Sequence, residues 1–139
     1  MGRLSAFLKA LPPGHQYAFE FRNPTWHTPD VYAALQHYNA AYCPFDLDGF
    51  QSSIEITADF TYVRLHGPGG KCQGSYSDAA LAVWAERVRN WRKELQGVYV
   101  YFDNDQAAYA VENALRLRQL TEAVRTTGSA PAFQDKVHA

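Results

Sequence analysis

The stretch TYVRLHGPGGKCQGSYS, residues 61–77, predicts a β-strand, a glycine-rich loop and the start of a helix. Its first six residues alternate between two faces, as they do in a strand. Val63 and Leu65 share an apolar face that suits packing against helices. Tyr62, Arg64 and His66 share the other face. A cation and an imidazole therefore stand at the end of the strand, where the loop begins.

The loop after this strand is rich in glycine, which allows positive φ angles and close approach of the backbone to a ligand. Ser77 and Asp78 then predict the N-terminus of a helix. A polar strand end, a glycine loop and a helix N-terminus together favour an anion site. The candidate anion-binding residues in this stretch are Arg64, Gly67, Gly69, Gly70, Lys71, Ser75 and Tyr76. The alternative is a tight turn, since GPGGK lacks the ending of a P-loop.

The rest of the chain predicts helices that alternate with strands. Helices are expected at residues 1–11, from 28 onward, at 78–95 and at 107–124, and strands at 17–22, 41–46 and 98–102. Residues 49–60 are less regular and are expected to contain one helical turn. Such alternation predicts a parallel sheet with right-handed crossovers, in which chemistry sits at the carboxyl ends of the strands.

Each predicted strand ends in polar residues, which we expect to converge on one mouth. Glu20, Asp46 and His66 are the candidates for general acid or base, and Arg22 joins Arg64 as an anion-binding residue. Asp103 and its neighbours predict a helix cap, with Asn104 expected to reach the mouth and bind the ligand. The alternative for the whole set is an internal ion-pair network. No metal ligand is assigned, although a Glu, Asp and His set keeps a divalent metal open as a cofactor.

Length, charge and cysteine content limit the class of protein. A chain of 139 residues is enough for one domain with its own core. The formal net charge of −1 gives no general attraction to nucleic acid or to anionic membranes. No apolar run is long enough to span a bilayer. The two cysteines, Cys43 and Cys72, form no zinc pattern and suit reduced thiols, so we expect a cytoplasmic protein.

Four segments together resemble the DUF72 family, also called YecE-like proteins. They are EFRNPTW at residues 20–26, TADFTYVRLHGPGGKCQGSYS at 57–77, YVYFDND at 99–105 and YAVENALRL at 109–117. The resemblance covers residues 2–120 and implies a TIM-type (β/α)8 barrel of unestablished activity. It implies only the second half of that barrel, with parallel strands five to eight and their helices. Cys72 departs from the aromatic residue that the resemblance leads us to expect there.

The resemblance implies a partial barrel domain at residues 1–125, followed by a tail at 126–139 that we expect to be mobile. In these barrels the loops after strands seven and eight often hold phosphate. Half a barrel also has two open sheet edges, so we expect a homodimer or pairing with an N-terminal half.

Three functions remain in view. The first is an enzyme site for a small phosphorylated or carboxylated substrate, the second a non-catalytic module for phosphates or nucleic acid, and the third an inactive half barrel. Whether the chain is an enzyme is left open.

Overall fold

The computed structural model describes residues 2–122 as a mixed α/β fold with parallel and mixed sheet pairing. The helices are α1 (Gly2–Ala10), α2 (Pro29–His37), α3 (Asp78–Glu94) and α4 (Tyr109–Glu122), with 3-10 turns at Pro24–Trp26 and Gln106–Ala108. The strands are β1 (Ala18–Phe19), β2 (Ala41–Tyr42), β3 (Phe45–Leu47), β4 (Phe50–Gln51), β5 (Phe60–Leu65) and β6 (Gly97–Phe102). Helices and parallel strands alternate as the sequence predicts.

The parallel strands follow one another in chain order across the molecule. β1 pairs with β2, β3 pairs with β5, and β5 pairs with β6, in each case parallel. The residues between β2 and β3 bridge the two sheets: the Cys43 amide donates to Phe19, and the Arg64 amide donates to the Pro44 carbonyl. Residues 41–47 therefore lie between β1 and β5. This order is the one expected for half of a (β/α)8 barrel, which stays a prediction.

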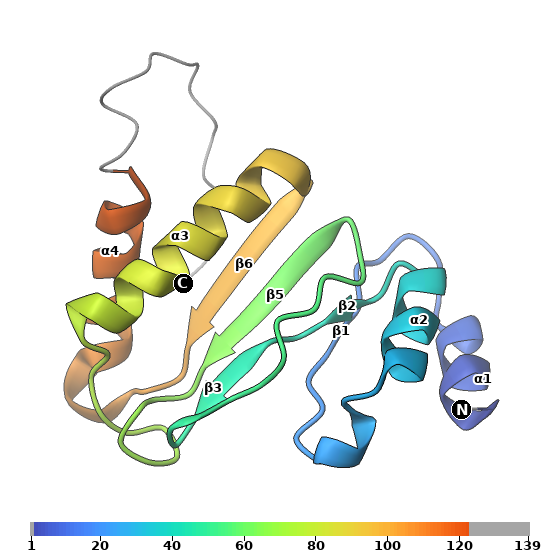
Figure 1. Cartoon of the computed structure of the whole chain (residues 1–139), viewed down its shortest axis with the longest axis horizontal. Coiled ribbons are helices and arrows are strands. Elements are labelled where there is room, and N and C mark those ends of the chain that lie inside the picture. Colours follow the sequence, from blue (N-terminus) through green and yellow to red (C-terminus); the bar gives the residue numbers. More distant parts are fainter. Residues whose placement is uncertain (1, 123–139) are drawn as a thin grey trace.

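All four helices cover the same face of these strands. Val63 and Leu65 of β5 pack on Leu81, Trp84 and Ala85 of α3 and on Leu117 of α4. On the other side of the row of strands, Tyr42 of β2 packs in a second cluster with Leu4 and Leu8 of α1 and Val31 and Leu35 of α2. Figure 1 shows α3 and α4 on the β6 side of the row of strands, and α1 and α2 on the β1 and β2 side. The predicted apolar face of residues 61–66 is thus confirmed as the helix-packing face.

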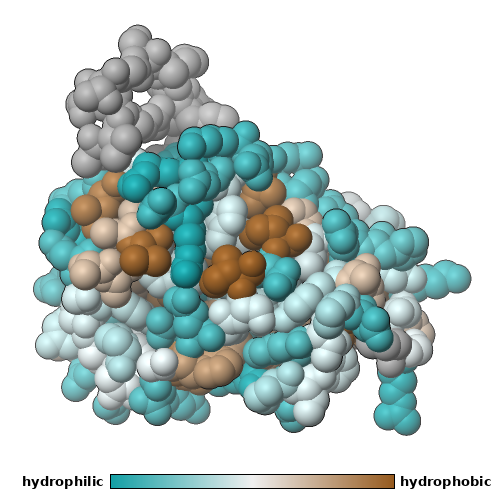
Figure 2. Space-filling model, in the orientation of Figure 1, coloured by the Kyte–Doolittle hydropathy of each residue, from teal (hydrophilic) through white to brown (hydrophobic). Residues whose placement is uncertain are grey.

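The surface in the same view is mostly hydrophilic, with hydrophobic residues in small separate groups (Figure 2). No helix in the described part of the chain, residues 2–122, has the length and apolar character needed to cross a bilayer. The tail expected at residues 126–139 lies outside the described residues.

Three expectations about the secondary structure need correction. The strand expected at residues 17–22 is only Ala18–Phe19, and the strand expected at 41–46 is divided into β2 and β3. Residues 49–60 contain no helical turn; β4 instead pairs antiparallel with β3, with Leu47 opposite Phe50. Asp48 and Gly49 form the two-residue connection and both have positive φ, 52° and 76°. That conformation matches the hairpin turns that an Asp-Gly pair favours. The signal was therefore present in the sequence, as the dipeptide at positions 48–49.

The glycine loop depends on one glycine next to His66. Gly67 has φ +113°, and a Cβ there would lie 2.2 Å from the Gln73 carbonyl oxygen. We predict that Gly67→Ala lowers the free energy of unfolding by about 1–3 kcal/mol because it combines backbone strain with a clash. Gly49→Ala is the matched control, because Gly49 also has positive φ but has no atom within 4 Å of the added Cβ. Urea unfolding that gives equal losses for the two variants would contradict this.

Candidate functional site

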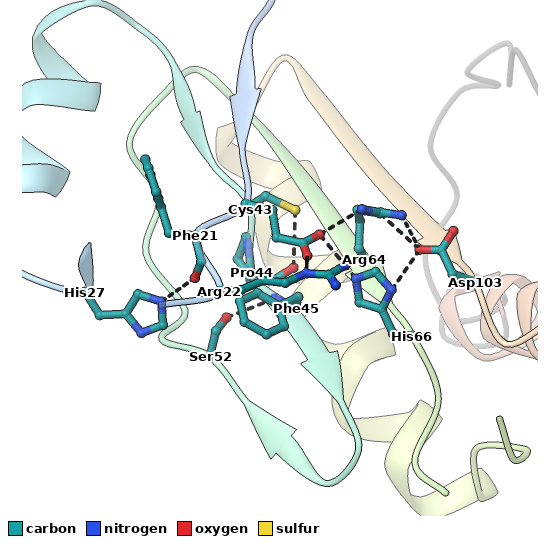
Figure 3. Close-up of polar contacts among 11 residues, drawn as sticks. Phe21, Arg22, His27, Cys43, Pro44, Phe45, Ser52, Arg64, His66 and Asp103 are labelled. Atoms are coloured by element: carbon teal, nitrogen blue, oxygen red, sulfur yellow. Dashed lines mark hydrogen bonds and ion pairs between the residues drawn. The ribbon is translucent and has the colours of Figure 1, made fainter. Parts of the chain in front are cut away.

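Charged side chains from three parallel strands meet at the carboxyl ends of the strands. Arg64, at the end of β5, uses all three guanidinium nitrogens: Nη1 contacts Glu20 Oε2, and Nε and Nη2 contact Asp103 Oδ2, each at 3.0 Å. His66 lies between the same two carboxylates, with Nε2 3.2 Å from Glu20 and Nδ1 3.4 Å from Asp103. Figure 3 shows Arg64 and His66 both directed toward Asp103. With Arg22, these residues form what we call the charged cluster.

The members of the charged cluster differ in exposure and in free hydrogen-bonding groups. The side chains of His66 and Glu20 are 2% and 12% exposed, whereas that of Arg22 is 48% exposed. Arg22 Nε donates to Glu20 Oε1 at 2.6 Å. The Arg22 Nη1 and Nη2 groups make no hydrogen bond to the residues that the structure describes. Arg22 therefore keeps both Nη groups for a ligand, whereas Arg64 keeps one N–H on each Nη.

Burial acts to raise the pKa of Glu20, but other contacts outweigh it. Hydrogen bonds from Arg22 and His66, together with the charges of His66 and Arg64, hold the pKa of Glu20 below its usual 4.5. Glu20 is thus an ionised, hydrogen-bonded carboxylate near neutral pH. The cluster contains two carboxylates, two guanidinium groups and one imidazole, so its charges are close to balanced.

An open cleft of about 620 Å³ runs along the strands from the charged cluster toward their amino ends. Glu20, Arg64 and Asp103 line the end of the cleft at the carboxyl ends of the strands. Its wall is formed by Tyr62 of β5 and by Tyr99 and Tyr101 of β6, which we call the tyrosine face. These side chains lie on the sheet face opposite the helices, because Tyr62 is paired with Tyr99 and Arg64 with Tyr101 in the β5–β6 register.

Cys43 also lines the cleft, but its chemistry makes it a poor nucleophile. Burial, reinforced by the negative charge of Glu20, raises the pKa of the Cys43 thiol to about 12. A thiol with that pKa is protonated at neutral pH, and the thiolate is the nucleophilic form. Cys43 thus contributes to the wall of the cleft rather than to covalent catalysis.

Asp46 does not join the mouth as the sequence predicted. It is paired with Leu65 in the β3–β5 register, so its side chain lies on the helix-packing face, away from Arg64. Burial raises its pKa, and a hydrogen bond with Tyr76 and the charge of His66 only partly offset that. Its Oδ1 atom is buried without a partner among the described residues. The expectation that Asp46 shares one mouth with Glu20, Arg64 and His66 is therefore wrong.

Tyr76 and Asn104 support the glycine loop from inside. Tyr76 is 5% exposed, and its hydroxyl accepts a hydrogen bond from the Gly67 amide. Asn104 is fully buried, and its Nδ2 donates to the Gly74 carbonyl and to Asn113 Oδ1. Neither side chain faces the cleft. Asp103, which the sequence assigned to a helix cap, is the residue that reaches the charged cluster. The alternation of side chains along β6 could have predicted this position of Asp103. Asp103 lies two positions after Tyr101 and four after Tyr99, so the three side chains point to the same face of the sheet.

The glycine loop uses many of its own polar groups. The amides of Gly67, Gly69, Gln73, Gly74 and Tyr76 each donate to a protein oxygen. The hydroxyl of Ser75 accepts from Asn113 Nδ2. Lys71 is exposed. The Gly67 and Gly69 amides are therefore not free to bind an anion, whereas the Ser75 hydroxyl keeps its own hydrogen to donate. The roles expected of these three residues stay predictions.

No group of three or more His, Cys, Asp or Glu side chains within residues 2–122 is arranged to hold a metal ion. In the charged cluster, the carboxylate oxygens are instead occupied by guanidinium and imidazole groups. The divalent metal left open by the sequence is therefore not carried into the proposal below.

Comparison with known families decides what the chain is related to. The family model described as "Protein of unknown function DUF72" matches residues 1–135. The chain belongs to the DUF72 family. No curated protein matches it. The resemblance seen in the RLHG and YFDND segments is thus confirmed at the level of the family, and the family description assigns no activity.

Solved DUF72 structures share the fold of this chain. A DUF72 family protein from Thermotoga maritima superposes with a TM-score of 0.77 at 22% identity, over 87% of this chain and 51% of that one. Two structures of a DUF72 family protein from Enterococcus faecalis give TM-scores of 0.69 and 0.65 at 19% and 22% identity. They cover 99% and 90% of this chain, but 55% and 53% of theirs. The chain thus spans about half the length of these relatives.

The lowered pKa of Glu20 predicts a pH-dependent contribution to stability. Because the carboxylate is better stabilised in the folded than in the unfolded protein, its contribution is present above pH 4.5 and is lost as the pH falls through the folded-state pKa. We expect Glu20→Gln to lower the free energy of unfolding at pH 7 by about 1–3 kcal/mol. The loss should shrink at acidic pH, where wild-type Glu20 is also neutral. A loss that is constant from pH 7 to acid, measured by urea unfolding, would contradict this.

Proposed function

We propose that the carboxyl ends of the strands form an enzyme site for acid–base chemistry on a small anionic ligand, phosphorylated or carboxylated. The observation that carries the proposal is the arrangement of Glu20, Arg64, His66 and Asp103. Three parallel strands bring these side chains into mutual contact at the open end of a cleft. Chemistry in parallel α/β folds occurs at this end of the strands.

Glu20 is the group in this proposal that exchanges a proton with the ligand. It is ionised, it lines the cleft, and it comes from β1, opposite Asp103 of the β6 end. His66 is too buried to contact a ligand and acts as a positioning residue: it fixes both carboxylates through its two ring nitrogens. Arg64 has the same positioning role, because each of its three nitrogens contacts Glu20 or Asp103, which leaves one N–H on each Nη.

Arg22 is the anchor for the anion. Its side chain is half exposed beside Glu20 and both Nη groups are available, so they can bind two oxygens of a phosphate or carboxylate. Lys71, exposed on the glycine loop, can add a second positive charge. This assignment places ligand recognition and proton transfer on neighbouring residues, Arg22 and Glu20.

Binding of inorganic phosphate tests the anion anchor. We expect phosphate to raise the melting temperature of the wild-type chain and to have little effect on Arg22→Ala, measured by thermal shift. Arg116→Ala is the matched control, since Arg116 pairs with Asp78 in an exposed ion pair outside the cluster, and it should respond as the wild type does. An equal phosphate response in Arg22→Ala would remove Arg22 from the site.

Turnover distinguishes an enzyme from a binding module. A panel of phosphate monoesters and phosphorylated sugars is incubated with the wild-type chain and with Glu20→Gln. We expect the wild-type chain to convert at least one of these compounds and Glu20→Gln to convert none. Phosphate should still stabilise the Glu20→Gln variant. Binding without any turnover in the wild type would instead support a non-catalytic anion-binding module.

A further inference from the structure

The tyrosine face, Tyr62, Tyr99 and Tyr101, is an uncovered sheet face. Tyr99 and Tyr101 are 41% and 44% exposed, although they lie in the middle of the longest strand pair. Tyr62 stacks on Tyr101 with ring centroids 4.7 Å apart. Helices of residues 2–122 pack only on the opposite face, through Val63, Leu65, Tyr42 and their partners. Ordered aromatic rings on an exposed sheet face are typical of an interface, where tyrosine is enriched.

Strands β6 and β1 also present open edges. The Asp103 amide donates to the Leu65 carbonyl on β5, so the amides of Val100 and Phe102, one residue out of phase, point away from β5. On β1, the Tyr17 and Phe19 carbonyls accept from Ala41 and Cys43, so the polar groups of Ala18 and Glu20 point outward. Edges of this kind pair with another strand when one is available.

We propose that the tyrosine face and these two edges form an interface with a second copy of the chain. Rotation about a two-fold axis parallel to the strands keeps the strands of both copies parallel. It places β6 of each copy beside β1 of the other. Within each copy the order across the sheet is β1, then β2 and β3, then β5, then β6, so the two copies together form a closed sheet. A two-fold assembly of this kind is self-complementary and pairs the β1 and β6 edges of both copies.

The length of the chain and the charges of its cluster are consistent with a second copy as the partner at this interface. The chain covers about half of each DUF72 structure, so two copies together have about the length of one of those relatives. The charged cluster of each copy combines two carboxylates with two guanidinium groups, so two clusters facing each other across one mouth carry little net repulsion. The cleft of about 620 Å³, open in the single chain, would become an enclosed space between two tyrosine faces. This interface does not rest on the proposed function.

Oligomeric mass tests the interface. Size-exclusion chromatography with light scattering over a dilution series should give twice the 15.7 kDa mass of the chain. Tyr101→Glu should shift the protein toward the monomer because it places a charge in the middle of the tyrosine face. Val111→Glu is the matched control, since Val111 is an exposed apolar residue on α4, and it should remain dimeric. A wild-type monomer at all concentrations, or a dimer that persists in a folded Tyr101→Glu variant, would overturn the proposal.

A second measurement uses the wild-type chain and does not depend on a variant that folds. Hydrogen exchange followed by NMR should show slow exchange at the amides of Val100 and Phe102, and dilution to the monomer should speed it. Fast exchange at both amides in a sample of dimeric mass would show that β6 remains an open edge and would overturn the strand pairing. Protection that is unchanged in the monomer would overturn it as well, because the protecting group would then belong to the same chain.

Discussion

The arrangement of the carboxyl ends of the strands depends on two carboxylates that share a guanidinium group and an imidazole. Glu20 and Asp103 lie 83 positions apart in the sequence, and both contact Arg64 and His66 from opposite sides. Burying Arg64 or His66 against the sheet without these partners would leave charged or polar groups unpaired, which is strongly unfavourable. The contacts therefore link β1, β5 and β6 at one end. They also leave both Nη groups of Arg22 free, and one N–H on each Nη of Arg64.

The sheet separates structural and functional tasks by its two faces. The helix-packing face carries aliphatic residues together with Asp46 and Asn104. Asn104 donates to the Gly74 carbonyl of the glycine loop, and Tyr76 of the same loop accepts from the Gly67 amide. The opposite face carries the tyrosines and ends in the charged cluster. A one-residue difference in position decides between these roles, because successive side chains in a strand point to opposite faces. Asp103 and Asn104 are neighbours in sequence and have unrelated surroundings for this reason.

Several features of the fold follow directly from local sequence patterns. The alternation in residues 61–66, the helical spacing of Leu81, Trp84, Ala85 and Val88, and the Ser77 cap predict β5 and α3, and the structure has both. Local patterns did less well where several weak signals compete. Pro44 interrupts the strand predicted at residues 41–46, and the Asp48–Gly49 turn creates a hairpin where one helical turn was expected. A turn of two residues outweighs the weak helical preference of its neighbours because it brings β3 and β4 into register.

The sequence by itself determined the order of helices and strands, the two faces of the central strand, and the family, because these depend on local spacing and on motifs. It also identified Glu20, Arg22, Arg64 and His66 as polar residues at strand ends. Only the tertiary structure decided which of these residues meet and which atoms they use. Asp46 was excluded and Asp103 included through the register between strands, which is set by contacts between distant segments. How many donors Arg64 and Arg22 keep free depends on those same contacts, and no local pattern records them.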